Sequence, residues 1–465
     1  MTANVKTTSI TIGATQVARW ANARKITLEQ IAEALADVHP GELRQFDDFG
    51  GEVSVDFATR LADLLDVDPE QLTSGPSIRP RAISMSADEI EGSRRSIQRD
   101  GIHFYDYYSL PAPHGEVGPV LLDIHCPADR LPALNNGHLE PALTVNLGPG
   151  DISGRWSDSA EGDGWEILAA NIDPRDSWII GDSYIEPSFC PHSYALASDV
   201  PARILSYTVG APLGPLLQRC DEWDDAAFER WIGQFDAVGC SAALLTREIT
   251  RRGWTNQSLA EQAEIPPAVL DDFCAGRRET IPMSSLVALC QTLGVDYRSF
   301  LPPAFDHDAL GKCGRSVAEA RATIRAFGPY EVASLAAATH VPDVYGIFMR
   351  IELDDHDDGE LDICDSGETH LLVTSGRLTL RWDDGGSIES QTLDHGDAIW
   401  IDAHVAFSLR GNGSTIKLGT TGGRGVASCD QNELTRTFSA ASTLRAGRRS
   451  RDSWGYDAAS GGDSK

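Results

Sequence analysis

Two segments of the sequence contain side chains that could bind a divalent metal ion. One reads NNGHLEPALTVNLGPGD and contains His138 and Glu140, and a later one reads GDSYIEPSFCPHSYAL and contains Glu186 and His192. Two imidazoles and one carboxylate on neighbouring strands form a facial triad, which leaves positions open for a substrate and O2 and suits non-haem Fe(II). The residues alone leave two candidates for the carboxylate, Glu140 and Glu186.

The competing interpretation is that His138 and His192 are ordinary loop histidines in a chain that has twelve histidines. Glu186 and His192 have the same parity along a strand, which would place them on one face. Prolines at 187 and 191 are expected to interrupt that strand, however, so parity alone does not decide whether the two side chains meet.

Basic and hydrogen-bonding residues near these segments predict that the substrate is a small anion. Arg99 and Tyr107 lie in QRDGIHFYDYY, Asn135 lies three residues before His138, and Lys25 lies in ANARK near the N-terminus. Lys and Arg neutralise a compact oxyanion, and the Tyr hydroxyl and Asn amide donate directional hydrogen bonds to it. Each could instead be a surface ion pair or a satisfied core group, and Lys25 by itself is typical of a solvated surface lysine.

An internal duplication indicates which elements must position these residues. The same order of elements is predicted for residues 14–72 and for residues 242–301: a helix, a turn, a short helix and two further helices. In each copy a threonine, Thr27 or Thr255, caps the short helix, and the last helix ends in Leu-x-Val-Asp. Both copies resemble the helix-turn-helix domain of phage repressors.

Each helical block is followed by a segment of short alternating apolar runs, such as VLLDI, ALTVNL and DAIWI, separated by turn residues. We therefore predict an α+β protein, a tandem repeat of an all-α helix-turn-helix domain and a β-barrel domain of the cupin or jelly-roll type. The predicted units are a first helical domain (1–80), a first β-domain with the metal site (81–215), a linker with the second helical domain (216–305), a second β-domain (306–440) and a C-terminal arm (441–465).

The second β-domain keeps the strand pattern in GETHLLVTSGRLTLRW and HGDAIWIDAHVAFSL but loses the set of metal ligands. His370 and His404 have no carboxylate at the matching place, because Ile401 and Asp402 stand near the position of Glu186. We expect this domain to be metal-free and structural, and a metal ion at His370 is the weaker alternative.

The charge balance argues against nucleic acid as a partner. The 465 residues include 69 acidic and 39 basic side chains, a net charge of −30, and residues 1–80 contain twelve acidic and seven basic ones. The third helices, HPGELRQFDDF and PPAVLDDFCAG, would be repelled by phosphates and have few side chains that read base edges. We expect no DNA binding, which disfavours the alternative of a cupin-containing helix-turn-helix transcription regulator.

The sequence predicts a cytoplasmic protein without a membrane partner. No apolar run approaches the ~18 residues of a membrane span, and the N-terminal MTANVKTTSITIG has no apolar signal core. Nine cysteines are scattered singly, without a CxxC pair, as is typical of reduced thiols.

Long segments of the chain resemble the 2-hydroxyethylphosphonate dioxygenase family. They are RRSIQRDGIHFYDYY, CPADRLPALNNGHLEPALTVNLGPGDISGRW and GDSYIEPSFCPHSYAL, together with WANARK near the N-terminus and TLRAGRR and WGYD near the C-terminus. The resemblance extends over essentially the whole chain. It implies that mononuclear Fe(II) is held by His138, Glu186 and His192, and that the phosphonate is bound by Lys25, Arg99, Tyr107 and Asn135.

Two related families differ from this pattern. Methylphosphonate synthase, which acts on the same substrate, has a glutamine four residues after the first histidine in place of the carboxylate, whereas this chain has Ala142 there and retains Glu186. The epoxidase of fosfomycin synthesis has one helical domain and one cupin, so the duplicated length counts against it.

The resemblance implies the reaction 2-hydroxyethylphosphonate + O2 → hydroxymethylphosphonate + formate, in a pathway of antibiotic biosynthesis. The reaction balances without an external reductant, so neither 2-oxoglutarate nor another organic cofactor is expected. Lys25, Arg99 and Tyr107 would orient the substrate dianion. Because Lys25 lies on the first helical domain, we expect that domain to cover the mouth of the barrel. We also expect a homo-oligomer, and whether Lys25 acts within its own chain or on a neighbouring subunit stays open.

Overall fold

The computed structural model describes most of the chain between Ser9 and Thr420. The described residues are 9–13, 16–17, 20–21, 24, 26, 28–36, 50–73, 80–99, 101–113, 115–130, 134, 137, 140–157, 164–186, 190–208, 224, 226–227, 229, 240–295, 297–300, 310, 312–338, 341, 344–353 and 359–420. Several predicted features lie outside them, namely Lys25, Thr27, Asn135, His138, the side chain of Arg99 and the arm 441–465.

In its described residues, the first helical unit combines helices with a small sheet. Strands β1 (Ser9–Gly13) and β2 (Gly50–Ser54) pair antiparallel beside α2 (Leu28–Ala36), α4 (Val55–Leu65) and the 3-10 turn η1 (Pro69–Leu72). The hydroxyl of Ser54 accepts a hydrogen bond from the amide of Phe57 and caps α4. Phe57, Leu61 and Leu65 lie on one face of α4 at helical spacing and form the centre of a buried core.

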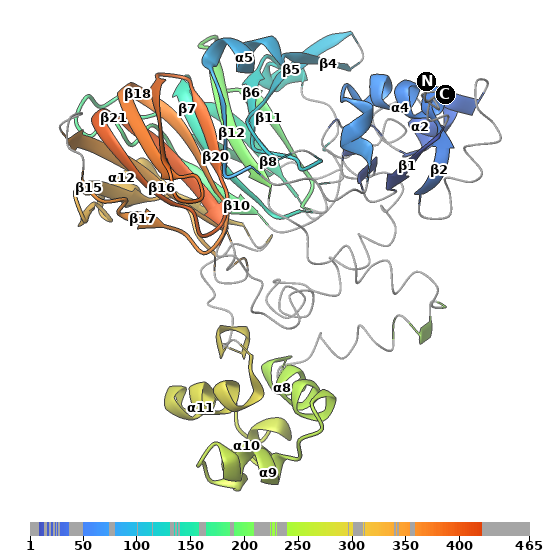
Figure 1. The fold of residues 1–465 in the computed structure, drawn as a ribbon, viewed down its shortest axis with the longest axis vertical. Helices are drawn as coiled ribbons and strands as arrows, with labels where there is room; N and C mark the ends of the chain where they lie inside the picture. The colour runs from blue at the N-terminus through green and yellow to red at the C-terminus, as the bar shows by residue number, and fades with distance from the viewer. Residues whose placement is uncertain are drawn as a thin grey trace, which may run out of the picture.

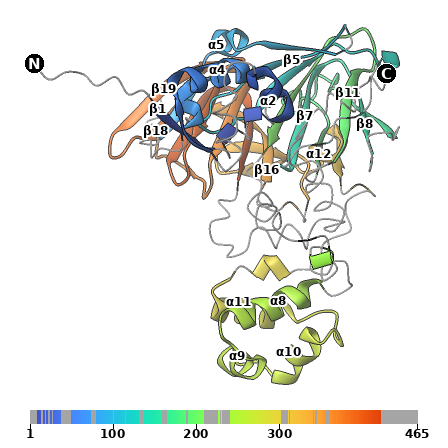
Figure 2. The ribbon, with the colours of Figure 1, turned by 90° about the vertical axis from the view of Figure 1, so that its right-hand side faces the viewer.

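The second helical unit has the helices that the sequence predicts. It contains α8 (Cys240–Arg251), α9 (Asn256–Gln262), α10 (Pro267–Cys274), α11 (Met283–Leu293) and the turn η3 (Tyr297–Phe300). Thr255 caps α9 in a reciprocal capping box with Ser258, and α11 ends at Gly294 in the left-handed conformation. Figures 1 and 2 show this unit apart from the sheets.

The first β-domain consists of two antiparallel sheets that face each other. The larger has the order β13 (Cys313–Arg315), β10 (Ser183–Glu186), β7 (Ala142–Pro149), β12 (Ala202–Thr208), β6 (Val120–Ile124), β5 (Ile102–Ser109) and β4 (Arg95–Arg99). The smaller has the order β11 (His192–Leu196), β8 (Ile152–Trp156) and β9 (Gly164–Leu168). An aromatic core that includes Tyr105, Trp156 and Tyr184 lies between them.

The second β-domain is a single nine-stranded sheet. Seven strands follow one another across the sheet in the order β14 (Arg325–Phe327), β15 (Tyr330–Ser334), β16 (Val344–Leu353), β21 (Ala406–Thr420), β18 (Thr369–Asp383), β20 (Ala398–Ile401) and β3 (Ala82–Met85). The remaining two pair at the side, β17 (Ile363–Cys364) with β21 and β19 (Ile388–Asp394) with β18. A buried core shared by both β-domains joins them. The α+β prediction is confirmed, and the described strands form packed antiparallel sheets, none of which closes into the predicted barrel.

The two β-domains exchange one short strand each. Strand β3 follows the first helical unit but pairs with β20, and β13 follows the second helical unit but pairs with β10. A short helix follows each exchanged strand, α5 (Ala87–Gly92) after β3 and α12 (Val317–Arg321) after β13.

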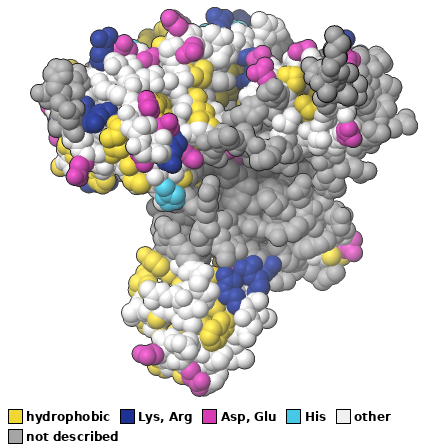
Figure 3. All heavy atoms as spheres, in the orientation of Figure 1, with side chains coloured by type: hydrophobic (Ala, Val, Ile, Leu, Met, Phe, Trp, Pro, Cys, Tyr) yellow, Lys and Arg dark blue, Asp and Glu magenta, His cyan; other side chains and the backbone are white. Residues whose placement is uncertain are grey.

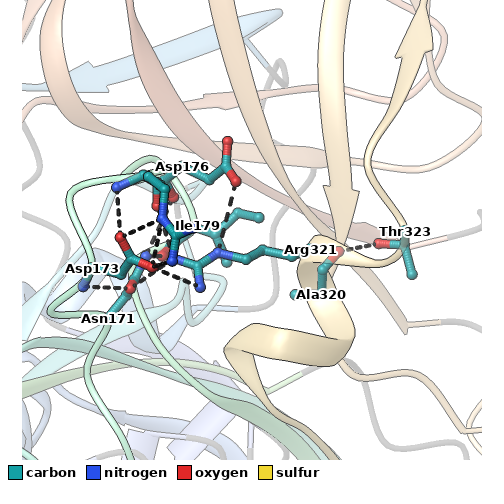
Figure 4. A network of polar contacts seen from close by, with 8 residues as sticks. Asn171, Asp173, Asp176, Ile179, Ala320, Arg321 and Thr323 are labelled. Atoms are coloured by element: carbon teal, nitrogen blue, oxygen red, sulfur yellow. Dashed lines mark hydrogen bonds and ion pairs between the residues drawn. The ribbon is translucent and has the colours of Figure 1, made fainter.

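Two aspartates at equivalent positions accept hydrogen bonds from the segments that follow the exchanged strands. Asp397 Oδ1 accepts from the amide of Ala87, and Asp182 Oδ1 accepts from the amide of Val317, both at 2.8 Å. Figure 4 shows Arg321 of α12 reaching from the second half of the chain to the loop at Asn171 and Asp173 in the first β-domain. The two halves are therefore intertwined.

Candidate active site

Glu186 and His192, two of the predicted metal ligands, lie together inside the first β-domain. Glu186 is the last residue of β10 and His192 is the first residue of β11. Glu186 Oε1 lies 3.3 Å from His192 Nδ1, and the two residues are only 1% and 5% exposed. A buried carboxylate beside a buried imidazole is a donor pair that suits a divalent metal ion.

Neighbouring groups fix the orientation of both side chains. The indole Nε1 of Trp156 donates to Glu186 Oε2 at 3.0 Å. His192 Nδ1 lies 2.9 Å from the carbonyl of Cys190 and 3.3 Å from Glu186 Oε1, and a neutral ring with its proton on Nδ1 can donate to these acceptors. The lone pair is then on Nε2, as a metal-binding histidine requires.

A glycine makes room for that indole. Gly154 lies two residues before Trp156 on β8, and a Cβ at this position would lie 1.9 Å from the Trp156 ring. Any larger residue at 154 would therefore displace the group that holds Glu186.

Tyr107 lies on the same face of the large sheet as Glu186. Strand alternation and register place Tyr105 and Tyr107 of β5 in the core that contains Tyr184 and Tyr194. Burial raises the pKa of Tyr184 and of Tyr194 well above the ordinary value, so both hydroxyls stay protonated. The wall beside Glu186 is therefore aromatic, neutral and poor in water.

The other predicted anion-binding residues are only partly described. Arg99 is the last residue of β4 and its backbone pairs with Ile102. Lys25, Asn135 and His138 lie outside the described residues. The structure therefore brings Glu186, His192 and Tyr107 into one domain interior and leaves the rest of the set as predictions.

The two candidates for the carboxylate occupy different places. Glu140 is half-buried in the turn that precedes β7. Ala142, the first residue of β7, is the register partner of Glu186 across the β7–β10 pair. Side chains at 142 and 186 project into the same space, because directly paired residues share a face of the sheet.

The structure does not bring together His370 and His404, the two candidate histidines of the second β-domain. His370 is buried at the interface, its ring 5.1 Å from that of Tyr207, and burial lowers its pKa to about 3, so it stays neutral. His404 is exposed on a turn. Ile401 pairs with Thr369 just as Glu186 pairs with Ala142, so an apolar side chain stands at the carboxylate position.

A second group of possible ligands, His103, Asp106 and His125, was not predicted. His103 Nε2 lies 2.8 Å from Asp106 Oδ1, and His125 Nε2 lies 3.0 Å from Asp106 Oδ2, with the two imidazoles stacked at 4.1 Å. A bulge at Phe104 in β5 moves His103 onto the face of Asp106. The side chains of this group face away from Tyr105, Tyr107 and Glu186, so the two groups are separate.

Comparison with protein families places these features in a known context. Residues 91–209 match the model of the 2-hydroxyethylphosphonate dioxygenase cupin-like domain, a range that includes Tyr107, Glu186 and His192. Residues 245–298 match the Cro/C1-type helix-turn-helix DNA-binding domain.

Individual relatives match almost the whole chain. The 2-hydroxyethylphosphonate dioxygenase of Streptomyces viridochromogenes is 44% identical over 443 residues, which are 95% of this chain and 98% of the relative. A structure described as Phpd with cadmium complexed with hydroethylphosphonate is 42% identical, covers 94% of this chain and 100% of its own, and has a TM-score of 0.62. Native PhpD with cadmium atoms is 43% identical with the same coverage and a TM-score of 0.63.

Among the described helices, none is both long and apolar enough to cross a membrane.

Proposed function

Because the chain belongs to the 2-hydroxyethylphosphonate dioxygenase family, we propose that it cleaves the carbon–carbon bond of 2-hydroxyethylphosphonate with O2 to give hydroxymethylphosphonate and formate. All atoms of the substrate and of O2 are accounted for in the two products, so no external reductant is required. The proposal therefore includes no 2-oxoglutarate.

His138, Glu186 and His192 would hold the Fe(II) ion. The observation that carries this assignment is the buried Glu186–His192 pair, with the carboxylate held by Trp156 and Nε2 of the imidazole left as the basic nitrogen. Bound there, Fe(II) supplies a Lewis acid for the substrate oxygens and a site that activates O2. The His103–Asp106–His125 group is a competing location, and it lies outside the aromatic interior.

The protein side chains bind and orient the substrate. Tyr107 would donate a hydrogen bond to the phosphonate, and Lys25, Arg99 and Asn135 would supply its remaining contacts, two of them cationic. Tyr105, Tyr184 and Tyr194 keep water from the reacting carbons. A fixed substrate orientation determines which carbon–carbon and carbon–hydrogen bonds face the metal.

The Ala142–Glu186 pairing favours the dioxygenase over methylphosphonate synthase. In the synthase the ligand is a glutamine at the position of Ala142, and in this chain the strand register places that position directly opposite Glu186. A ligand from either strand would reach the same space. This chain supplies a carboxylate from β10 and only a methyl group from β7, which is the dioxygenase arrangement.

The test is anaerobic reconstitution with Fe(II), addition of 2-hydroxyethylphosphonate and then O2, with products followed by phosphorus NMR and a formate assay. Hydroxymethylphosphonate and formate in equal amounts support the proposal. Methylphosphonate as the product would assign the chain to the synthase reaction instead, and absence of turnover with bound Fe(II) would contradict both.

The metal ligands are tested by Fe(II) stoichiometry in three variants. Glu186→Ala and His192→Ala should lose tight Fe(II) binding, whereas His125→Ala should retain one Fe(II) per chain. Loss of the bound ion in His125→Ala alone would move the catalytic metal to the His103–Asp106–His125 group.

The helix-turn-helix match raises DNA binding as a second candidate function, and we propose that it is absent. Helix α10 presents Asp271, which accepts a hydrogen bond from Asn256, and Asp272, which is paired with Arg277. Carboxylates on this helix repel the phosphates of a duplex. Figure 3 shows that Lys and Arg side chains gather at one place on this unit, where a duplex could in principle bind. A salt-sensitive gel shift with duplex DNA would therefore overturn the proposal that DNA binding is absent.

A further inference from the structure

Arg95 links the first helical unit to the strand that carries Tyr107. It is the first residue of β4, and the register pairs it directly with Tyr107 of β5. Its guanidinium lies over the Tyr107 ring, with 5.1 Å between the central carbon and the ring centroid, a cation–π contact. Its Nη1 donates to the carbonyl of Arg24 at 3.0 Å.

The Arg24 carbonyl belongs to the peptide bond that leads into Lys25. Arg24 itself is fixed within the helical unit, because its guanidinium donates to the carbonyls of Leu65 and Asp66, each at 2.9 Å. Arg95 therefore reaches the backbone next to Lys25 from the β-domain, within the same chain.

A cavity lies at this junction. It has a volume of about 260 Å³ and is lined by Trp20 and Arg24 from the helical unit and by Tyr107 and Ser109 from β5, among others. The helical unit and the β-domain therefore meet near Tyr107 around a partly open space rather than a fully packed interface.

Arg24 and Arg95 supply positive charge at this junction, and Asp66 and Glu116 supply negative charge. Burial and the nearby charge of Arg24 lower the pKa of Arg95 to about 10, so Arg95 is still a cation at neutral pH. Its Nε and Nη2 are buried without an acceptor among the described residues. The charge of Asp66 partly offsets these two half-buried guanidinium groups, and a negatively charged ligand would offset them further.

We propose that Arg95 is a positioning residue for phosphonate binding, which fixes the ring of Tyr107 and holds the backbone of Arg24 in the helical unit beside it. The proposal rests on the function proposed above and extends it, since it makes the helical unit act within its own chain. Arg95 acts through Tyr107 and the Arg24 backbone and not by contact with the reacting carbons.

The test compares Arg95→Met and Arg95→Lys with Arg94→Met. Arg94 is the matched control because it is the neighbouring arginine but lies on the other face, half-exposed and 3.3 Å from Asp106. Arg95→Met should raise KM for 2-hydroxyethylphosphonate about tenfold, the loss of one charge-assisted contact, while kcat changes by less than about threefold. Arg95→Lys should fall between wild type and Arg95→Met, and Arg94→Met should equal wild type.

A second readout does not depend on turnover. In the anaerobic Fe(II) protein, calorimetry should show the same loss of 2-hydroxyethylphosphonate affinity in Arg95→Met, with an unchanged Fe(II) stoichiometry. If Arg95→Met does not fold, Arg95→Lys decides the question.

Unchanged affinity and KM in the folded Arg95 variants would overturn the proposal, as would an equal loss in Arg94→Met. Failure of the proposed function is a separate result: wild-type protein would then bind the phosphonate without converting it.

Discussion

The carboxylate of Glu186 depends on a donor from another strand. Trp156→Phe removes the indole N–H but keeps an aromatic ring against Tyr184, whose ring centroid lies 4.9 Å away. We expect the affinity for Fe(II) to fall about tenfold, because outer hydrogen bonds orient metal-binding carboxylates. A titration with Fe(II) under anaerobic conditions measures the change.

Trp178 provides the control for this substitution. It is also buried, and its indole N–H has no acceptor among the described residues. Trp178→Phe should therefore leave Fe(II) affinity unchanged, and an equal loss in both variants would attribute the effect to general loosening of the domain.

Asp106 predicts a pH-dependent contribution to stability. Burial would raise the pKa of this carboxyl group, but hydrogen bonds from Ser96, His103 and His125 lower it to about 2. Since the folded pKa is below the unfolded value of about 3.9, ionised Asp106 stabilises the fold above pH 4, and this contribution is lost as the pH falls toward 2. Asp106→Asn should cost about 1–3 kcal/mol at pH 7.

Urea unfolding at pH 7, 4 and 3 measures this effect. The difference in unfolding free energy between wild type and Asp106→Asn should be smaller at pH 3 than at pH 4, because Asp106 begins to gain a proton in this range. The exposed Asp129 supplies the control Asp129→Asn, which should unfold like wild type throughout. A gap that stays the same at pH 3 would contradict the assignment.

The residue types of the site were more predictable than its supporting contacts. The pattern in GDSYIEPSFCPHSYAL led to Glu186 and His192, which the structure brings together. The Trp156 donor could not be predicted, because it lies 30 residues away on a strand of the other sheet. The position of His103 was missed because the bulge at Phe104 breaks the alternation on which such reasoning depends.

At the level of secondary-structure elements, two equivalent aspartates form hydrogen bonds with the segments that follow the exchanged strands. Asp182 accepts from the amides of Val317 and Ala169, and Asp397 accepts from those of Ala87 and Asp394, all at 2.8 Å. Asp182→Ala and Asp397→Ala should each lower the free energy of unfolding by about 1–3 kcal/mol, the usual cost of leaving backbone amides without their acceptor.

Only one of the two substitutions should affect the metal. Asp182 directly precedes β10, which ends in Glu186, whereas Asp397 precedes the equivalent strand β20, which ends in Ile401. Fe(II) titration of both variants should therefore show weaker binding in Asp182→Ala alone. Equal weakening in Asp397→Ala would mean that the strands of the second domain also determine the geometry at Glu186.

Helices and long strands were predictable from local signals, but strand pairing was not. Thr255 as an N-cap and the leucines of α11 predicted helices that the structure contains. Strands β3 and β13 have only four and three residues, AISM and CGR, and their partners lie in the opposite half of the chain. A local pattern of this length carries no information about a partner that lies over a hundred residues away.

At the scale of the whole molecule, the exchange predicts that the halves depend on each other. If the chain is divided between Thr208 and Cys240, the first half lacks β13 and exposes the edge of β10, and the second half lacks β3 and exposes β20. Exposed edge strands promote aggregation. Each half expressed alone should be insoluble or unfolded, and co-expression should give a soluble pair, as measured by gel filtration and circular dichroism.

A protease site introduced at the same place provides the control. Cleavage after folding should leave the two halves associated, because their contacts have already formed. A first half that folds cooperatively and binds Fe(II) by itself would show that the exchanged strand is dispensable.

The reciprocal exchange of β3 and β13 also bears on the ancestry of the chain. Two half-length copies that trade their first β-strands would form a symmetric homodimer, with the same carboxylate receiving the incoming segment in each subunit. Joining two such genes keeps the dimer geometry but frees each copy to mutate separately. Asp182 and Asp397 occupy equivalent places in the two copies, whereas Glu186 of the first copy is matched by Ile401 of the second, so only the first copy has a carboxylate at that position.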